Sequence, residues 1–173
     1  MDTWQAIRTV RVVRAFRPDP LPSAVLDRIL DAGRHAGSSK NRQRWDFVIV
    51  TDREKLQELA TAGPFAGHLA GAAAAIALVT PDPCAKPGRL SVMWDVGRAA
   101  QNMVLAAWAQ GVGSVPATVY EPLVARKVLG YPEDLHCEFI LSFGYPADPE
   151  DLGRPPRAGG RKSVDEIVHR ECW

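Results

Sequence analysis

The longest regular pattern in this sequence is an apolar repeat over residues 90–110, and it limits the folds that the chain can adopt. Apolar and small residues recur at three- and four-residue spacing, the period of one face of an α-helix. They are Met93, Val96, Gly97, Ala100, Met103, Val104, Ala107 and Trp108. Gly111 follows as a C-terminal stop. Because residues 97, 99 and 100 are small, we expect a central helix that packs closely against its neighbours.

The rest of the chain divides into short helices and strands, with Pro and Gly at the breaks. We expect helices over 4–9, from an N-cap at Ser23 to near Gly37, and after a cap at Asp52. A further helix should have Pro122 in its first turn and Gly130 beyond its end. Apolar runs over 47–50, 74–80, 113–119 and 137–143 predict strands. After a polar loop over 147–160, Ser163 and Glu166 have the spacing of a capping box that begins a last short helix. No regular crossover units separate the strands, so the pattern favours an α+β fold.

Charge and composition argue against several classes of partner. The 173 residues carry a formal net charge of +1 with both signs interspersed, so we expect no binding of nucleic acid or of an anionic membrane surface. The most apolar run, 69–80, is too short to span a bilayer, and no basic-then-apolar leader is present, so we expect a cytoplasmic protein. Cys84, Cys137 and Cys172 are too far apart to predict a disulfide framework or a four-ligand zinc site. The length suits a single domain over residues 1–173.

Common catalytic motifs are not found. The chain has no G-x-G-x-x-G after a strand, no G-x-S-x-G elbow and no H-E-x-x-H pair. No residue pair points to a Ser/His or paired-carboxylate hydrolase, although spacing alone leaves that class open. We therefore predict no catalytic side chain and no metal ligand.

The segment GSSKNRQRWDFVIV, residues 37–50, places a very polar loop directly before an apolar strand. Loops on a rigid scaffold often carry function, but the same composition describes an ordinary turn. Asn41 and Gln43 fit either interpretation, since they are able to cap the preceding helix and fix a turn. Near the other end of the chain, Arg161 and Lys162 precede the last predicted helix, which is a candidate anion site.

Five segments of the chain, in the order in which they occur, are together similar to one known protein family. They are IRTVRVVRAF (7–16), ILDAGRHAGSSKNRQRWDFVIVTD (29–52), AAQNMVLAAWAQGVGS (99–114), FGYP (143–146) and GRKSVDEIVH (160–169). Together they resemble the flavin-dependent nitroreductase family, nearly from end to end. The resemblance implies an α+β homodimer with a central mixed or antiparallel sheet flanked by helices. It also implies one FMN in each of two clefts at the subunit interface.

The resemblance implies that the loop over 37–44 reaches the flavin ring, typically that of the partner subunit. Ser38, Ser39 and Asn41 would then offer hydrogen bonds to the cofactor. Trp45 and Phe47 would anchor the loop to the core.

The family's R-R-S-x-R pattern matches residues 10–14, and here the chain departs from it. Val10 stands in place of an Arg and Val12 in place of a Ser, and both family residues commonly serve the FMN phosphate and ribityl chain. The resemblance leaves Arg11, Val12 and Arg14 as cofactor-contacting positions, with Arg161 as a further phosphate ligand. Because a guanidinium holds a phosphate with two parallel hydrogen bonds, two or three Arg residues are sufficient. The alternative for Arg14 is a solvated surface residue with a buried stem.

Pro116, Ala117 and Thr118 match positions beside the isoalloxazine ring, where small side chains let backbone groups approach the ring edge. Alternatively, Pro116 only ends a strand. His35 matches a flavin-contacting position in some relatives, and a core histidine is the alternative. Three other aromatic residues are interpreted as packing groups: Phe16 in the core, and Trp94 and Trp108 in the core or at a dimer contact.

The activity implied by the resemblance is NAD(P)H-dependent two-electron reduction of a small organic acceptor such as a nitroaromatic or a quinone. In this chemistry a hydride passes from the nicotinamide to FMN, and the electrons then pass to an acceptor in the same cleft. Arg14 is the predicted positive charge beside the N1 and O2 edge of the ring, with Thr118 as a weaker donor.

Two alternatives stay open. One is another flavoenzyme activity on the same fold, such as a dehydrogenase, a dehalogenase or a flavin-cleaving enzyme; the short segment over 81–90 predicts no large lid. The other is a non-catalytic flavin-binding carrier, which the changes at Val10 and Val12 motivate.

Overall fold

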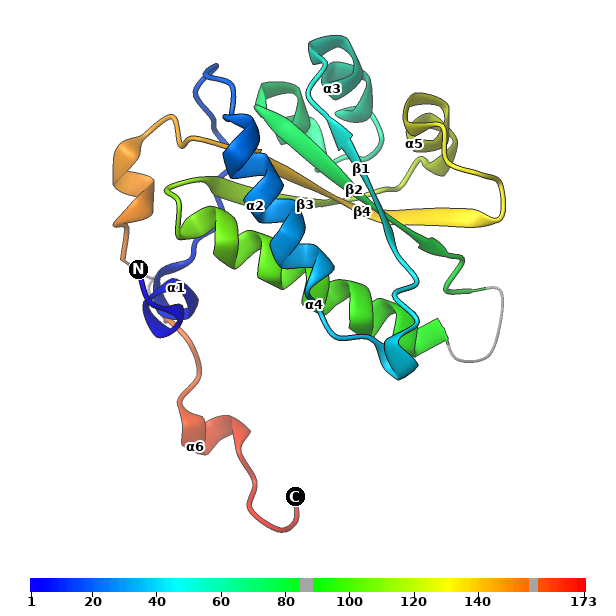
Figure 1. Cartoon of the computed structure of the whole chain (residues 1–173). Helices are drawn as coiled ribbons and strands as arrows, with labels where there is room; N and C mark the ends of the chain where they lie inside the picture. The colour runs from blue at the N-terminus through cyan, green and yellow to red at the C-terminus, as the bar shows by residue number, and fades with distance from the viewer. Residues whose placement is uncertain (85–88, 156–158) are drawn as a thin grey trace.

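A four-stranded antiparallel sheet forms the centre of the fold (Figure 1). The computed structural model describes residues 1–84, 89–155 and 159–173. The strands are β1 (Asp46–Val50), β2 (Ala74–Pro81), β3 (Gly113–Thr118) and β4 (Leu135–Gly144), and their order across the sheet is β1-β2-β4-β3. Each neighbouring pair in this sheet is antiparallel, which confirms the α+β class and favours the antiparallel alternative over a mixed sheet.

Helices cover both faces of this sheet (Figure 1). In chain order the remaining elements are α1 (Thr3–Thr9), α2 (Ser23–Arg34), the 3-10 helix η1 (Ser39–Asn41), α3 (Arg53–Leu59), the 3-10 helix η2 (Gly67–Gly71), α4 (Arg89–Trp108), α5 (Pro122–Leu129), the 3-10 helix η3 (Pro149–Leu152) and α6 (Val164–Ile167). α2 and α4 pack on the face that carries Ile76 and Phe143, and α3, η2 and α5 pack on the face that carries Ala77 and Ile140. Because both faces of β2 are covered, the strand is apolar without alternation from Ala74 to Val79.

α4 is the central helix that the sequence predicts, and its packing confirms this. Ala99 and Met103 are fully buried, and Gly33 of α2 lies so close to α4 that a Cβ at this position would collide with the Met103 side chain. Gly97, however, is exposed, and a Cβ built on it would meet no atom within 4 Å. The expectation of close packing at position 97 is therefore wrong within one chain, because Gly97 is exposed. The close approach of α2 to α4 is at Gly33, beside Met103.

Local capping signals set several of the helix boundaries. The Asp52 carboxylate accepts the Lys55 N–H at 2.9 Å at the start of α3. Gly130 takes a left-handed φ of 71° directly after α5 and ends it. The predicted N-cap at Ser23 is wrong: Pro22 is the N-cap of α2, because its carbonyl accepts the N–H groups of the first turn, and Ser23 is already helical.

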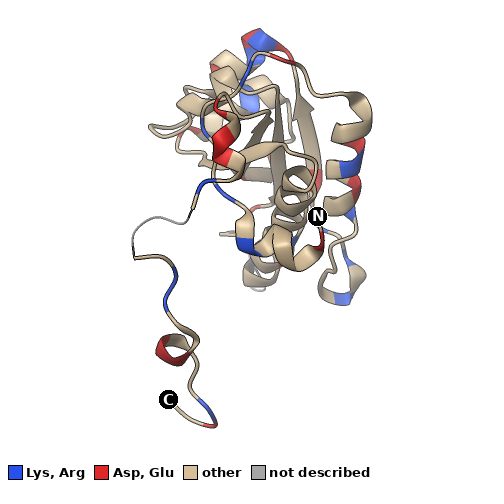
Figure 2. Ribbon diagram, turned by 90° about the vertical axis from the view of Figure 1, so that its left-hand side faces the viewer, with Lys and Arg blue, Asp and Glu red and all other residues tan. Residues whose placement is uncertain are grey.

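The C-terminal region leaves the body of the protein. The predicted loop over 147–160 contains η3, and residues 156–158 lie outside the described residues, as do residues 85–88 of the segment for which the sequence predicts no large lid. Residues 159–173 form an arm that extends away from the sheet and its helices (Figures 1 and 2). The Ser163 N–H donates to Glu166 Oε2 at 2.7 Å in the predicted capping box at the start of α6. The arm exposes the apolar side chains of Val164, Ile167, Val168 and Trp173.

No helix within the described ranges is long and apolar enough to cross a membrane.

Candidate functional site

The outer edge of β3 presents backbone groups that β4 does not use. Along an antiparallel strand, successive residues direct their N–H and C=O groups to opposite neighbours. The Ser114 carbonyl accepts the Val13 N–H at 3.1 Å, on the side away from β4. The Pro116 carbonyl and the Thr118 N–H therefore face outward on the same edge. As a proline, residue 116 has no backbone N–H that would be left unpaired there. Since Pro116 lies inside β3, the interpretation that it only ends a strand is wrong.

The side chains at this edge leave the backbone accessible. Pro116 is exposed, Thr118 is half-buried and Ala117 is 2% exposed. By the same alternation, Ala117 directs its backbone groups to β4, so the polar groups on this edge come from its two neighbours.

The segment that follows α1 runs beside β3 and brings three predicted site residues to the same edge. Val12 forms a parallel bridge with Ser114. The Arg11 guanidinium donates from Nη1 to the carbonyls of Arg8 at 3.1 Å and Val10 at 2.9 Å, and its buried Nε has no hydrogen-bond partner among the described residues. Val12 is 53% exposed, and Arg14 is exposed as well. One side of Arg11 is thus committed to the end of α1, whereas Arg14 faces solvent.

His68, which the sequence analysis did not single out, lies behind this edge. Its Nδ1 is 2.9 Å from the buried Ser142 Oγ, which donates to the Val115 carbonyl at 3.2 Å. Its Nε2 is buried without a hydrogen-bond partner in the described part of the chain. Burial lowers the pKa of the imidazole, and the charge of Arg14 lowers it further, while the backbone of Pro116 raises it. His68 is therefore a neutral imidazole near neutral pH, close to Arg14. A single His among small and apolar neighbours in η2 gives no sequence signal for this contact.

The polar loop before β1 has an unusual backbone. Lys40, Asn41 and Gln43 all have positive φ, at 54°, 53° and 47°, a region that non-glycine residues seldom occupy. The Ser38 hydroxyl accepts the Gln43 N–H at 2.9 Å, and Gln43 Nε2 donates to Asn41 Oδ1 at 3.1 Å. Asn41 and Gln43 therefore fix a turn, as one interpretation of the sequence expects, but their hydrogen bonds are within the loop and do not cap α2.

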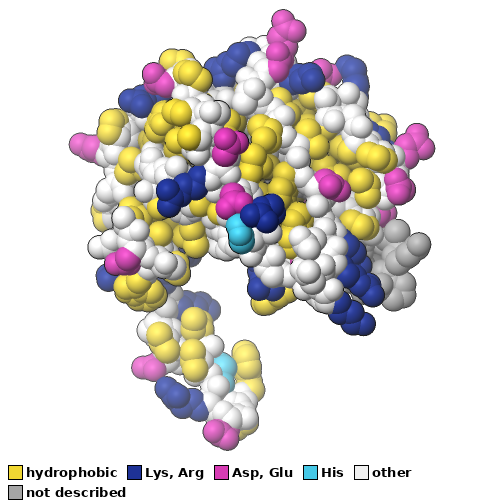
Figure 3. Space-filling model, in the orientation of Figure 1, with side chains coloured by type: hydrophobic (Ala, Val, Ile, Leu, Met, Phe, Trp, Pro, Cys, Tyr) yellow, Lys and Arg dark blue, Asp and Glu magenta, His cyan; other side chains and the backbone are white. Residues whose placement is uncertain are grey.

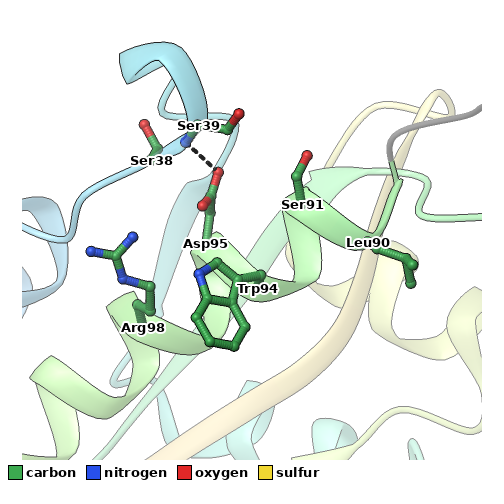
Figure 4. A pocket seen from close by; sticks show the side chains of 7 residues that line it. All are labelled: Ser38, Ser39, Leu90, Ser91, Trp94, Asp95 and Arg98. Atoms are coloured by element: carbon green, nitrogen blue, oxygen red, sulfur yellow. Dashed lines mark hydrogen bonds between the residues drawn. The ribbon is translucent and has the colours of Figure 1, made fainter. Parts of the chain in front are cut away.

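This loop is bound to α4. The Ser39 N–H donates to Asp95 Oδ2 at 2.8 Å, and Arg44 Nη2 donates to Ser91 Oγ at 2.9 Å. The two segments enclose an open groove of about 550 Å³ (Figure 4), lined by Ser38, Ser39, Leu90, Ser91, Trp94, Asp95 and Arg98. Sequence reasoning missed Asp95, since an Asp in a helix is normally a surface residue.

The two groups of predicted site residues lie at opposite ends of α4. The loop with Ser38, Ser39 and Asn41 contacts α4 at Asp95, whereas the N-terminal segment contacts its last residue, where Trp108 Nε1 donates to Thr9 Oγ1 at 2.9 Å. From Asp95 to Trp108 the helix rises roughly 20 Å, at about 1.5 Å per residue. Arg161 belongs by its residue number to the arm over 159–173, which leaves the body (Figure 2). A single chain therefore does not bring the predicted site residues into one cleft.

The remaining aromatic and imidazole predictions have mixed outcomes. Trp45 and Phe47 are half-buried and stacked with ring centroids 6.5 Å apart, beside the core that α2 and α4 cover. Phe16 and Trp108 pack in a small cluster with Val13, but Trp94 is 71% exposed and is not a core residue of this chain. His35 is exposed and lies 3.3 Å from the Asp31 carboxylate, so the interpretation as a core histidine is wrong, because its position just after α2 turns the ring to solvent.

On the face that Figure 3 shows, no large patch carries charges of one sign. Figure 3 shows acidic and basic side chains interspersed over this face, with hydrophobic side chains between them. Within the described ranges, no three His, Cys, Asp or Glu side chains are grouped so that they could hold a metal ion.

Comparison with known proteins gives a consistent result. The family model described as "Nitroreductase family" matches residues 7–64 and 64–145. A protein of Archaeoglobus fulgidus, named provisionally as an NADH dehydrogenase/NAD(P)H nitroreductase, is 37% identical, with 96% of each chain covered. The NADPH-flavin oxidoreductase of Vibrio harveyi is 32% identical, over 98% of this chain and 75% of that protein. The crystal structure of an NADPH:FMN oxidoreductase from Vibrio harveyi, complexed with NAD+, superposes with a TM-score of 0.84 at 26% identity, covering 99% of this chain and 77% of that one.

Proposed function

Because the chain belongs to the nitroreductase family, we propose that it is an FMN-dependent oxidoreductase that uses NAD(P)H to reduce a small organic acceptor by two-electron transfer. Nitroaromatic compounds and quinones are the acceptor classes we propose, with residues 1–173 as one FMN-binding domain. The relatives named as NAD(P)H nitroreductase and as NADPH-flavin oxidoreductase support this reaction class.

The outward-facing edge of β3 supports a flavin at this position. The pyrimidine side of an isoalloxazine ring carries carbonyl oxygens and a ring N–H in one plane, so it pairs best with coplanar donors and acceptors. The Pro116 carbonyl and the Thr118 N–H provide one of each along the same strand edge. The Ala117 side chain is buried and does not project over this edge.

Arg11, Val12 and Arg14 border the same edge and are the proposed contacts to the rest of the cofactor. Arg14 is exposed beside His68, so its guanidinium is available to a phosphate or to the N1 and O2 edge of the ring. Arg11 has already committed Nη1 to two backbone carbonyls. Val12 has no hydroxyl, and its exposed side chain offers apolar contact only.

The proposed active form is a homodimer, and the observation that carries it is the separation of the two halves of the site along α4. An isologous interface around a twofold axis across α4 brings the end of one helix next to the start of the other. The loop with Ser38, Ser39 and Asn41 would then complete the site at the partner's β3 edge. The outer face of α4 fits such a contact, since Leu90, Trp94, Gly97, Arg98 and Gln101 are all exposed on it.

The C-terminal arm has a role in the same dimer. Its apolar side chains are exposed, and the arm extends away from the body of its own chain (Figure 1). Exposed apolar groups of this kind commonly mark a contact surface. We propose that the arm packs on the partner subunit and brings Arg161 to the FMN phosphate there.

When bound, FMN supplies the redox chemistry: it accepts a hydride from NAD(P)H and gives two electrons to the acceptor. The protein's own residues position this exchange. The β3 edge orients the ring, the loop over 37–44 narrows the cleft, and the Arg14 charge stabilises the negative charge that the ring gains.

An absorption spectrum of the purified protein tests the proposal. We expect a flavin spectrum that bleaches on anaerobic addition of NADH or NADPH and returns when a quinone or a nitroaromatic compound is added. Initial rates with both substrates varied should give parallel lines, because the two substrates occupy one cleft in turn. A bound flavin that NAD(P)H does not bleach would favour a non-catalytic flavin carrier, and intersecting lines would contradict a shared cleft.

A further inference from the structure

Asp95 is an unusual residue for the middle of this fold. It is 5% exposed, and among the described residues it is the only buried Asp, Glu, Lys or Arg. A buried carboxylate is costly unless hydrogen bonds compensate for the lost water. Asp95 therefore needs a hydrogen-bond partner inside the fold.

That partner is the backbone of the polar loop. Asp95 Oδ2 accepts the Ser39 N–H at 2.8 Å, and the bond joins positions 56 residues apart in the sequence (Figure 4). Hydrogen bonds to an ionised acceptor are roughly twice as strong as neutral ones. Beside it, Arg98 lies against the start of the loop, where a Cβ at Gly37 would come within 2.8 Å of its Nη2. The loop is thus held at its first residues by α4.

The loop needs such an anchor because its conformation is strained. Lys40, Asn41 and Gln43 occupy the left-handed region directly after Ser39. Non-glycine residues persist there only when their surroundings hold them. The bonds between Ser38, Asn41 and Gln43 are within the loop, so they shape the turn but do not fix where it lies. Asp95 and the Arg44–Ser91 hydrogen bond fix its position on α4.

We propose that Asp95 is a positioning residue that holds the loop carrying Ser38, Ser39 and Asn41 in the conformation that meets the flavin. This inference rests on the proposed function for the identity of the ligand. Because the loop would meet the ring and not the phosphate, loss of Asp95 weakens binding of FMN and riboflavin by the same factor. Since α4 also carries the proposed dimer face, the same helix forms the interface and holds the loop in position.

The test compares Asp95→Ala with a matched control, Asp52→Ala. Asp52 also binds a backbone N–H through its carboxylate, at 2.9 Å, but it caps α3 on the other face of the sheet. We expect Asp95→Ala to speed amide hydrogen exchange at Ser39 about tenfold or more, and to weaken both flavins by about tenfold or more. Asp52→Ala should change neither quantity, although it lowers the melting temperature.

Asp95→Asn keeps the size and one acceptor oxygen, so it serves where Asp95→Ala does not fold. It should recover part of the exchange protection and part of the affinity for both flavins. Faster exchange at Ser39 with unchanged flavin affinity would overturn this inference and leave the proposed function standing. An equal loss of flavin affinity in Asp52→Ala would have the same consequence. A wild-type chain that binds neither FMN nor riboflavin would overturn the proposed function and this inference together.

Discussion

Gly97→Gln separates the fold of one chain from its association with a second. Gly97 is exposed on α4, and a side chain there meets no atom of its own chain within 4 Å. Gln is also a better helix former than Gly, by roughly 0.5 kcal/mol or more. The folded monomer should therefore be as stable as the wild type or slightly more stable.

In the proposed dimer the same change has the opposite effect. A close helix contact at Gly97 leaves no room for a Gln side chain, and overpacking typically costs about 1–3 kcal/mol at each site. A twofold interface contains the site twice, so the total is about 2–6 kcal/mol. The dissociation constant should then rise about thirtyfold or more. FMN affinity should fall with it, because each cleft needs the partner's loop.

Light scattering across micromolar concentrations, together with thermal unfolding followed by circular dichroism, measures both effects. The matched control is Gly71→Gln, which places the same side chain at another exposed glycine with no atom within 4 Å, in η2 on the opposite face of the sheet. A Gly97→Gln chain that stays as dimeric as the wild type would refute the interface on α4. A stable folded wild-type monomer at micromolar concentration would refute the dimer itself.

Three further predictions follow from single residues. Arg161→Ala should lower the affinity for FMN at least about tenfold, since a charge-assisted hydrogen bond contributes on the order of 1.5–3 kcal/mol. The affinity for riboflavin, which has no phosphate, should stay almost unchanged. Equal losses of affinity in a titration would mean that Arg161 does not bind the phosphate. Burial raises the pKa of the Cys137 thiol to about 12. A thiol reagent should therefore modify the exposed Cys84 and Cys172 in the native protein and should modify Cys137 only after unfolding. Rapid labelling of three thiols in the native protein would contradict this prediction. The pKa of His68 is lowered from 6.5 in the fold, so the unfolded chain binds a proton at this residue more readily than the folded chain does. The contribution of His68 to stability is therefore complete above about pH 6.5, and it declines as the pH falls below that value. Urea unfolding at several pH values should show a weaker decline for His68→Gln, and an identical decline would show that other groups cause it.

Features that depend only on neighbouring residues could be predicted from the sequence. The Asp52 cap, the left-handed Gly130 and the capping box at Ser163 each act within a few residues, so the sequence predicts them directly. The apolar runs likewise predict the strands, and the order of the motifs predicts the family. The error at Ser23 is also local, because Pro22 and Ser23 are both able to precede the first helical turn and Pro22 takes the N-cap position. The error at His35 concerns burial, because a residue just past the end of α2 is turned to solvent.

The arrangement of the site depends on contacts between segments that are far apart in the sequence. Asp95 meets Ser39 across 56 residues, and His68 meets Ser142 across 74, so both contacts depend on how α4 and η2 pack against the sheet. The same packing places the polar loop and the β3 edge at opposite ends of α4, which no motif order reveals. Hydrogen bonds over three or four residues follow from backbone geometry alone, whereas a buried carboxylate finds its partner only after helices and sheet have come together. For this reason the local signals were readable in the sequence, but the contacts of Asp95 and His68 and the separation of the two halves of the candidate site were not.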